Sequence, residues 1–340
     1  MGPAGMTIRS MKNGSGLRTR ISVVTPTLFR PEEVMGLLEN LCRQILLPEE
    51  VIIVDGAPQE EKSTEARVVR AHARLPFRCH YIRAGGGTAV QRNIGIDAAS
   101  GNFLAFIDDD VRLDRDFFER IVEVFADDDG CRIGGIAGYI TNQYFDPQRS
   151  LRWKWYRRLR LLSTYEPGRY DFNTGYPVNR YMYPPHSGVR KIDFMGANCA
   201  VWRKAVFSQG FRFDEFFADY GVLEDVHFAL RAGRKWDLYE CGRARCVHLR
   251  SPGGRVNSGQ MNYKTAVNYR YVFVDAVPRR TWRQECAFWR MQIFDLCRLA
   301  YVALRSGNPA DWHAVGGKCA GIRDAVGVRP PPRGPGEWRR

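Results

Sequence analysis

Three consecutive carboxylates, Asp108, Asp109 and Asp110, follow an apolar run and form the part of the sequence best suited to chemistry. Residues 103–107 are apolar at every position, which is typical of a strand buried on both faces. Carboxylates at the end of a buried strand are costly unless something neutralises them. A divalent cation with hard oxygen ligands would do so. The sequence therefore predicts a metal site here, and a solvated acidic turn is the alternative.

Other polar residues stand where further strands end or a helix begins. Asp55 follows an apolar stretch, Glu224 and Asp225 open a helical pattern, and His248 ends a short strand. A metal needs two or more oxygen ligands at one point, and a histidine can complete the shell. A further carboxylate, away from the metal, could take a proton from an incoming hydroxyl. Together these groups indicate group transfer from an activated phosphate ester.

The elements that must position these residues alternate between strand and helix, as in a doubly wound parallel α/β sheet. Ligands bind beyond the carboxyl ends of the strands in such sheets, and that is where the acids would lie. A glycine-rich loop at 84–88 opens a helix and could approach a phosphate, although dinucleotide and P-loop motifs are absent. The expected strands are 21–27, 51–54, 79–82 and 103–107, and a long loop is expected at 165–188.

Composition limits the class of protein. The 340 residues are 44% hydrophobic and 26% charged, which is typical of a globular protein. No apolar run approaches the roughly 18 residues of a membrane-spanning helix, and the first 20 residues lack the apolar core of a secretory signal. The nine cysteines form no Cys-x-x-Cys pair. We therefore expect reduced thiols in a cytoplasmic protein, with a place at the inner face of the cell membrane as a further option.

The net charge of +14 is concentrated in two segments. Residues 151–190 carry 8 Lys/Arg against 2 Asp/Glu, and residues 279–340 carry 12 against 5. Localised positive charge indicates an anionic partner, such as ligand phosphates, an anionic membrane or nucleic acid, or else a solvated arginine-rich surface. The spacing of apolar residues over 282–305 predicts an amphipathic helix, which could dock on the domain or lie on a membrane.

Several short motifs, taken in order, resemble family 2 glycosyltransferases with the GT-A fold. The resemblance extends over about 21–250 and implies a mostly parallel, Rossmann-type central sheet flanked by helices, with a C-terminal helical extension. The motifs are Val-Val-Thr-Pro-Thr at 23–27, Val-Asp-Gly at 54–56, Gly-Gly-Gly-x-x-x-x-Arg-Asn-x-Gly at 85–95, Phe-Ile-Asp-Asp-Asp at 106–110, Gly-Ala-Asn at 196–198 and Glu-Asp at 224–225.

The resemblance also implies a domain plan. We expect a catalytic domain at 20–255, made of a donor half at 20–135 and an acceptor half at 136–255. A C-terminal helical region at 256–325 follows it. Flexible tails are expected at 1–19 and 326–340.

Roles for the donor-binding residues follow from the resemblance. Asp108 and Asp110 correspond to the two acids of the Asp-x-Asp motif, with Asp110 the direct metal ligand and Asp109 in the middle. The other residues implied to bind the donor are Thr25, Pro26, Thr27 and Asp55 around the nucleoside, with Asp55 accepting a bond from the base, together with Arg92, Asn93 and Asn198. Helix capping and surface charge are the alternatives for Arg92 and Asn93.

The catalytic assignment rests on the same likeness. Asp225 matches the general base and Glu224 its neighbour, although acids are also favoured at a helix N-terminus for structural reasons. His248 matches a histidine that completes the metal shell in some members, and a structural hydrogen bond is the alternative. Val-Asp-Gly-Ala stands where the family often has Asp-Asp-Gly-Ser. No Gln-x-x-Arg-Trp motif of processive synthases is present, which favours a single-addition enzyme.

The implied function is a metal-dependent, inverting hexosyl- or deoxyhexosyltransferase of cell envelope polysaccharide synthesis, using Mg²⁺ or Mn²⁺. Its partners would be a UDP-, dTDP- or GDP-linked sugar, a saccharide or lipid-linked saccharide acceptor, and an anionic membrane in peripheral contact, with no nucleic acid. A nucleotidyltransferase acting on sugar phosphates is the alternative. A remote alternative is single-stranded nucleic-acid binding by the basic and aromatic residues at 153–160.

Overall fold

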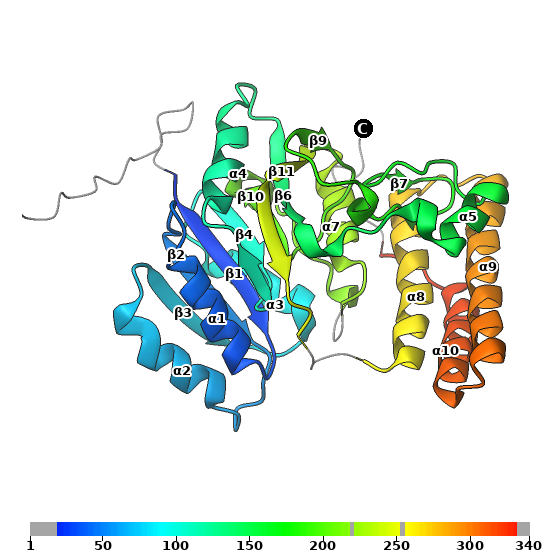
Figure 1. The fold of residues 1–340 in the computed structure, drawn as a ribbon, viewed down its shortest axis with the longest axis horizontal. Coiled ribbons are helices and arrows are strands. Elements are labelled where there is room, and N and C mark those ends of the chain that lie inside the picture. The colour runs from blue at the N-terminus through cyan, green and yellow to red at the C-terminus, as the bar shows by residue number, and fades with distance from the viewer. Residues whose placement is uncertain (1–18, 218–220, 252–255, 332–340) are drawn as a thin grey trace, which may run out of the picture.

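A nine-stranded mixed sheet forms the centre of the protein (Figure 1). The computed structural model describes residues 19–217, 221–251 and 256–331. The sheet has the strand order β3-β2-β1-β4-β10-β6-β11-β5, and β9 also pairs with β11. The strands are β1 (Ile21–Thr27), β2 (Glu50–Asp55), β3 (Arg78–Arg83), β4 (Phe103–Ile107), β5 (Val111–Leu113), β6 (Ile133–Ile140), β9 (Val189–Lys191), β10 (Cys199–Arg203) and β11 (Asp237–His248).

Strand direction places the carboxyl ends together. Strands β1, β2, β3 and β4 are parallel, as the alternation of strands and helices predicted, and β6 is parallel to β11. The antiparallel strand β10 lies between β4 and β6, and β5 and β9 pair antiparallel with β11. The prediction of an α/β fold with a largely parallel central sheet is confirmed.

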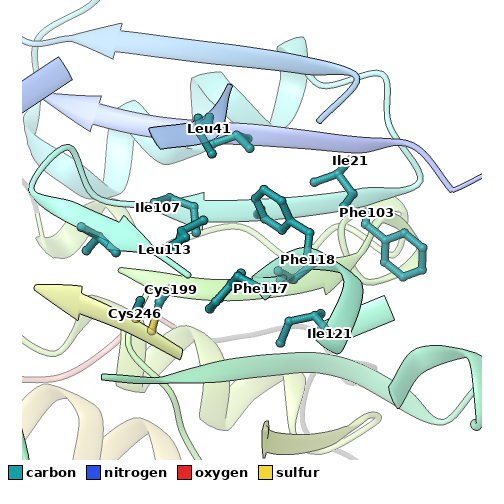
Figure 2. Close-up of a cluster of buried hydrophobic side chains, with 14 of the residues drawn as sticks. Ile21, Leu41, Phe103, Ile107, Leu113, Phe117, Phe118, Ile121, Cys199 and Cys246 are labelled. Carbon is teal, nitrogen blue, oxygen red and sulfur yellow. The ribbon is translucent and has the colours of Figure 1, made fainter. Parts of the chain in front are cut away.

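Successive side chains of the central strands point to opposite faces of the sheet, so they belong to two separate hydrophobic cores. Val23 and Ala105 face α1, α2 and α4, whereas Val24 and Phe106 face α3, α6 and α7. Figure 2 shows part of the first core, where Phe103, Phe117 and Phe118 lie close to the sheet. The helices are α1 (Pro31–Leu41), α2 (Ser63–Ala71), α3 (Gly87–Ala98), α4 (Phe117–Ala126), α6 (Lys204–Ser208) and α7 (Glu224–Ala232).

The segment between β6 and β9 is more ordered than expected. The long loop expected at 165–188 instead contains a short hairpin, β7 (Tyr170–Asp171) with β8 (Tyr176–Pro177). The helix α5 (Leu151–Arg158) precedes it and buries Trp153 and Tyr156 in a third apolar cluster. Because these two rings are buried, they are not available for base stacking, and Trp155 is the one exposed aromatic residue left at 153–160.

Three helices complete the described chain and lie side by side next to the sheet domain (Figure 1). They are α8 (Ser258–Ala276), α9 (Trp282–Ser306) and α10 (Pro309–Ala325). The amphipathic helix predicted at 282–305 is confirmed as α9, whose first turn is fixed by a capping box between Thr281 and Gln284. Within the described residues, no helix combines the length and apolar character needed to span a bilayer. The tails expected at 1–19 and 326–340 lie mostly outside the described residues.

Candidate active site

The structure brings Asp108, Asp110 and His248 into one group of ligand atoms. One ligand atom from each residue lies within 4.8 Å of the others. Strand pairing explains this, because His248 at the end of β11 is in register with Val111, directly after the acids. His248 Nε2 lies 3.0 Å from Asp110 Oδ1. The pairing of β11 with β5 therefore brings together two residues that are 138 positions apart in the sequence.

The electrostatics of this pair favour its charged form. Burial raises the pKa of Asp110, but the hydrogen bond and charge of His248 and the charge of Arg30 outweigh burial, so that the pKa is lowered. Burial lowers the pKa of His248, and Asp110 more than offsets this, so that the pKa is raised. At Asp108 burial dominates, and its pKa is raised despite the charge of Arg92.

His248 is held in place from its other side. Its Nδ1 atom lies 2.7 Å from Gln143 Nε2, and its backbone exchanges hydrogen bonds with the side chain of Asn142. Gln143 is buried in a 3₁₀ turn directly after β6. This contact fixes the ring so that Nε2 faces the carboxylates. The sequence analysis missed Gln143, because a lone glutamine in a turn carries no pattern.

The middle acid, Asp109, lies outside the ligand group. Its Oδ2 accepts a hydrogen bond from Thr27 Oγ1 at 2.7 Å, and its Oδ1 accepts one from Arg30 Nη1 at 3.0 Å. Burial raises the pKa of Asp109 to about 6. Arg30 also approaches Asp110 Oδ2 at 3.6 Å and donates to the carbonyl of Ser251 at 3.2 Å. Arg30, which the sequence analysis also missed, thus ties the end of β1 to the acidic loop.

Arg92 joins the metal-ligand acids to the acids of α7. Its Nη1 donates to Glu224 Oε1 at 2.8 Å, and its Nη2 donates to Asp108 Oδ1 at 3.2 Å. Arg92 is 4% exposed and its guanidinium lies over the ring of Phe213. A buried arginine needs such partners, since an unpaired charge there would be very costly. The predicted site residues of α3, the acidic loop and α7 therefore form one contiguous group.

Asp225 lies beside this pair, and within the described part of the chain only one of its two carboxylate oxygens accepts a hydrogen bond. Leu223, with φ of 71°, turns the chain into α7, and Asp225 Oδ1 accepts a bond from Val226 N–H at 2.7 Å. Burial, followed by the charge of Glu224, raises the pKa of Asp225 to about 7. A Cβ atom at Gly196 would lie 3.3 Å from Asp225 Oδ2 and 2.9 Å from Asn198 Oδ1. The glycine thus leaves room beside both side chains.

A further set of predicted site residues is the one expected to surround the nucleoside of the donor. Thr25, Pro26, Thr27 and Asp55 are all buried at the ends of β1 and β2. Asp55 already accepts bonds from the Tyr81 hydroxyl and the backbone of residue 57. Thr27 also donates a hydrogen bond to Asp109, whereas the buried Thr25 hydroxyl has no hydrogen-bond partner among the described residues. Contact of these residues with a nucleotide stays a prediction.

Asn93 and Asn198 differ in their surroundings. Asn93 exchanges two hydrogen bonds, both of 2.9 Å, with the backbone of Phe213, so its amide holds a loop in place. The backbone carbonyl of Asn198 instead accepts a hydrogen bond from the backbone N–H of Asp108, so this residue lies next to the acids. Its side-chain amide donates to the Tyr181 hydroxyl at 3.5 Å.

The residues present fit a divalent cation. Two carboxylates and an imidazole offer hard oxygen ligands and a nitrogen ligand at one point. Among the described residues, five carboxylates face three arginines and one histidine, so the group has an excess of negative charge that a cation would relieve. The five carboxylates are Asp108, Asp109, Asp110, Glu224 and Asp225.

Comparison with known proteins agrees with this arrangement. The overall fold is similar to that of a mannosyltransferase from Pyrobaculum calidifontis, solved in complex with GDP-Man and Mn²⁺, with a TM-score of 0.53 and 14% identity over 94% of this chain and 89% of that chain. The fold is thus that of the GT-A glycosyltransferases. Residues 22–183 match the model of glycosyl transferase family 2.

Two curated relatives add to the picture. An uncharacterized glycosyltransferase of Haemophilus influenzae is 33% identical over 104 residues, which are 31% of this chain and 34% of the relative. The chondroitin synthase of Escherichia coli is 26% identical over 253 residues, which are 70% of this chain and 35% of the relative. The matches thus span about a third of each relative's length.

Proposed function

We propose that the protein is a metal-dependent, inverting glycosyltransferase that moves a sugar from a nucleoside-diphosphate donor to a hydroxyl group. The observation that carries the proposal is the double contact of Arg92 with Asp108 and Glu224. Through it, candidate metal ligands and the candidate base lie in one group of side chains. A sugar nucleotide held by the ligand acids would thereby be near the base.

Asp108, Asp110 and His248 are the residues that would hold the cation. When bound, the cation would neutralise the donor diphosphate and the charge that develops on it. Gln143 orients His248 for this role, and Arg30 holds Asp109 and Asp110 in place. These contacts thus hold a group of negatively charged side chains in position before a ligand binds.

Asp225 is the proposed general base. Its carboxylate takes the proton of the acceptor hydroxyl as the oxygen forms a bond to the anomeric carbon. The bond from that carbon to the diphosphate breaks, and its electron pair leaves with the nucleoside diphosphate. Attack from the side opposite the leaving group inverts the anomeric configuration. Glu224 is held by Arg92, which leaves Asp225 as the acid able to accept the proton.

The range of substrates is part of the proposal. The donor would be a UDP-, dTDP- or GDP-linked hexose or deoxyhexose, with Mg²⁺ or Mn²⁺. The acceptor would be a saccharide or lipid-linked saccharide of the cell envelope. The family assignment, the bacterial relatives and the GDP-Man complex of the structural neighbour support this range.

The nature of the released product tests the proposal. The protein is incubated with a panel of sugar nucleotides, Mn²⁺ or Mg²⁺ and saccharide acceptors, and the products are separated by chromatography. Release of a nucleoside diphosphate with elongation of the acceptor would support glycosyl transfer. Formation of pyrophosphate from a nucleoside triphosphate and a sugar phosphate would instead support a nucleotidyltransferase and overturn the proposal.

An anionic membrane surface is the further partner that we propose, with α9 as the contact. Trp282, Ile293 and Leu304 recur every eleven residues, so they lie on one side of the helix, and they are 71%, 55% and 72% exposed. The exposed arginines nearby are Arg279, Arg283, Arg290 and Arg305. An apolar helix side flanked by arginines matches the chemistry of an anionic lipid surface.

A further inference from the structure

A polar cavity of about 260 Å³ lies in the helical part of the protein, where α5, α8, α9 and α10 meet. Its volume is just below the range of about 300–1,000 Å³ that is typical of small-molecule sites. None of the side chains that line the cavity belongs to the group around Asp108, Arg92 and Asp225. The cavity is therefore a separate feature that the proposed activity does not use.

The charges around this cavity do not balance. Arg152, Arg298 and Lys318 line it together with a single carboxylate, Asp295. Asp295 lies 2.8 Å from Arg298 Nη2, 3.5 Å from Lys318 Nζ and 3.9 Å from Arg152 Nη2. All three cations thus share one acid, which leaves two positive charges in excess. Lys318 is buried, whereas Arg152 and Arg298 are partly exposed at the edge of the cavity. An excess of positive charge around a buried cation favours an anionic ligand.

Lys318 is the most enclosed of these cations. It is 2% exposed, and its Nζ donates to Gln292 Oε1 at 2.7 Å. Gln292, itself 5% exposed, uses its carbonyl oxygen for this bond, so its amide N–H groups are the part that can serve a ligand. Buried polar groups such as the Lys318 ammonium group and the Gln292 amide can fix the orientation of a ligand as well as attract it.

The two arginines retain donors for an incoming group. Arg152 Nε donates a hydrogen bond to the Tyr156 hydroxyl at 2.8 Å, and Arg152 Nη2 donates one to the Tyr176 hydroxyl at 3.1 Å. Arg298 gives Nε to Asp295 at 2.9 Å. Among residues 19–217, 221–251 and 256–331, no acceptor is bonded to Nη1 of either arginine. A guanidinium group with unused N–H donors can bind two phosphate oxygens at once, which a lysine ammonium group does less well.

Aromatic rings form the rest of the wall. The rings of Tyr156 and Tyr176 lie 5.8 Å apart, and those of Tyr176 and Tyr269 lie 6.0 Å apart. The hydroxyl groups of Tyr156 and Tyr269 stay protonated, because burial raises the pKa of both well above the usual range. The wall therefore adds no negative charge, and its ring faces can pack against the carbon skeleton that carries the anion.

We propose that this cavity binds a phosphate monoester, with the phosphate held by Lys318, Arg152 and Arg298 and its organic part against the tyrosine wall. The phosphate could belong to a soluble sugar phosphate or to the headgroup of a lipid, and the chemistry of recognition is the same. The proposal does not depend on the glycosyl transfer proposed above, because the lining residues and the candidate active site are distinct sets.

Calorimetric titration of the full chain tests this directly. It is carried out in EDTA without nucleotide, with inorganic phosphate, glucose 1-phosphate or a short-chain phosphatidic acid below its micelle concentration as the titrant. The variants are Lys318→Met, which keeps the length of the side chain, and Arg298→Gln. Asp110→Asn serves as the control for binding at the candidate metal site.

We expect saturable binding of at least one organic phosphate, weakened at least about tenfold by Lys318→Met or Arg298→Gln and unchanged by Asp110→Asn. Binding of glucose 1-phosphate alone would identify a soluble ligand, and binding of phosphatidic acid alone would identify a lipid headgroup. Should Lys318→Met not fold, Arg298→Gln carries the comparison. The proposal is overturned by the absence of saturable binding, by equal affinity in the cavity variants, or by loss of binding in Asp110→Asn.

Discussion

Arg92 Nη1 donates a hydrogen bond of 2.8 Å to Glu224 Oε1, across a separation of 132 residues in the sequence. The same guanidinium reaches Asp108 Oδ1 at 3.2 Å. One buried side chain of α3 therefore connects the acidic loop after β4 to the first turn of α7. The candidate donor site and the candidate base are held together by this link, and most of the predictions below concern the groups on either side of it.

Replacement of Asp225 by Asn should lower kcat by about 10²–10⁴-fold, since the amide cannot accept the proton of the acceptor. The Asn side chain still offers Oδ1 to the Val226 N–H, so the first turn of α7 should be preserved. Donor affinity, measured by calorimetry with Mn²⁺ present, should stay within about twofold of the original value. Asp129→Asn, at an exposed position, is the matched control. Unchanged turnover in Asp225→Asn would remove this residue from the role of base.

The pH dependence of kcat/KM should show an acidic limb near pH 7. Burial and Glu224 raise the pKa of Asp225 to about 7, so the base is protonated and inactive below that pH and active above it. An ordinary aspartate, with a pKa of about 3.9, would give a flat profile between about pH 5 and 8.

The Glu224→Gln variant tells Asp225 apart from other titrating groups. The amide can still accept from Arg92 but carries no negative charge, so the pKa of Asp225 should fall and the limb should move to lower pH. The profiles are measured at saturating Mn²⁺. A limb that stays in place in Glu224→Gln would assign it to a different residue, such as His248.

Gln143→Leu should weaken Mn²⁺ binding by about 10–100-fold although Gln143 does not contact the ligand oxygens. The leucine removes the partner 2.7 Å from His248 Nδ1, so the ring loses the contact that aims Nε2 at Asp110. Mn²⁺ affinity is measured by electron paramagnetic resonance. Gln148→Leu, on an exposed turn of the same segment, is the control. Equal affinity in Gln143→Leu and the original protein would mean that His248 is not a ligand or needs no support.

The sequence was sufficient for the features that depend on local pattern. The uniformly apolar run before Asp108 predicted β4, and the apolar spacing of 282–305 predicted α9. Residue type and strand-end position indicated a metal site at Asp108–Asp110, the family resemblance implied Asp108, Asp110 and His248 as its ligands, and the sheet brings these three residues together. The order of the motifs also indicated the family whose model matches residues 22–183.

Features that depend on pairing between distant segments were not predicted. Arg30 is a lone arginine before a helix, and only the fold brings it to Asp109. Residues 165–188, rich in Gly and Pro, were expected to form a loop, but a hairpin forms because it packs against α5 and α9. Asp55 lies at a strand end as predicted, yet its carboxylate already accepts a hydrogen bond from the hydroxyl group of Tyr81 on β3.

The exposed side of α9 should bind anionic vesicles. We expect the protein to sediment with vesicles that contain phosphatidylglycerol, to stay in solution with pure phosphatidylcholine, and to dissociate as salt is raised. Trp282→Ser combined with Leu304→Ser should abolish sedimentation, whereas Val69→Ser on α2, which is 66% exposed, should not. Equal sedimentation of the double variant would exclude this side of α9 as the contact.

The central claim is that Asp108, Asp110 and His248 hold the cation that grips the donor diphosphate. Anomalous diffraction from crystals soaked with Mn²⁺ and a nucleoside diphosphate tests it most directly. We expect one strong manganese peak within bonding distance of Asp110 and His248, in contact with a diphosphate oxygen and on the same side of the sheet as Asp225. A bound nucleotide with manganese elsewhere, or with no manganese at these side chains, would contradict it.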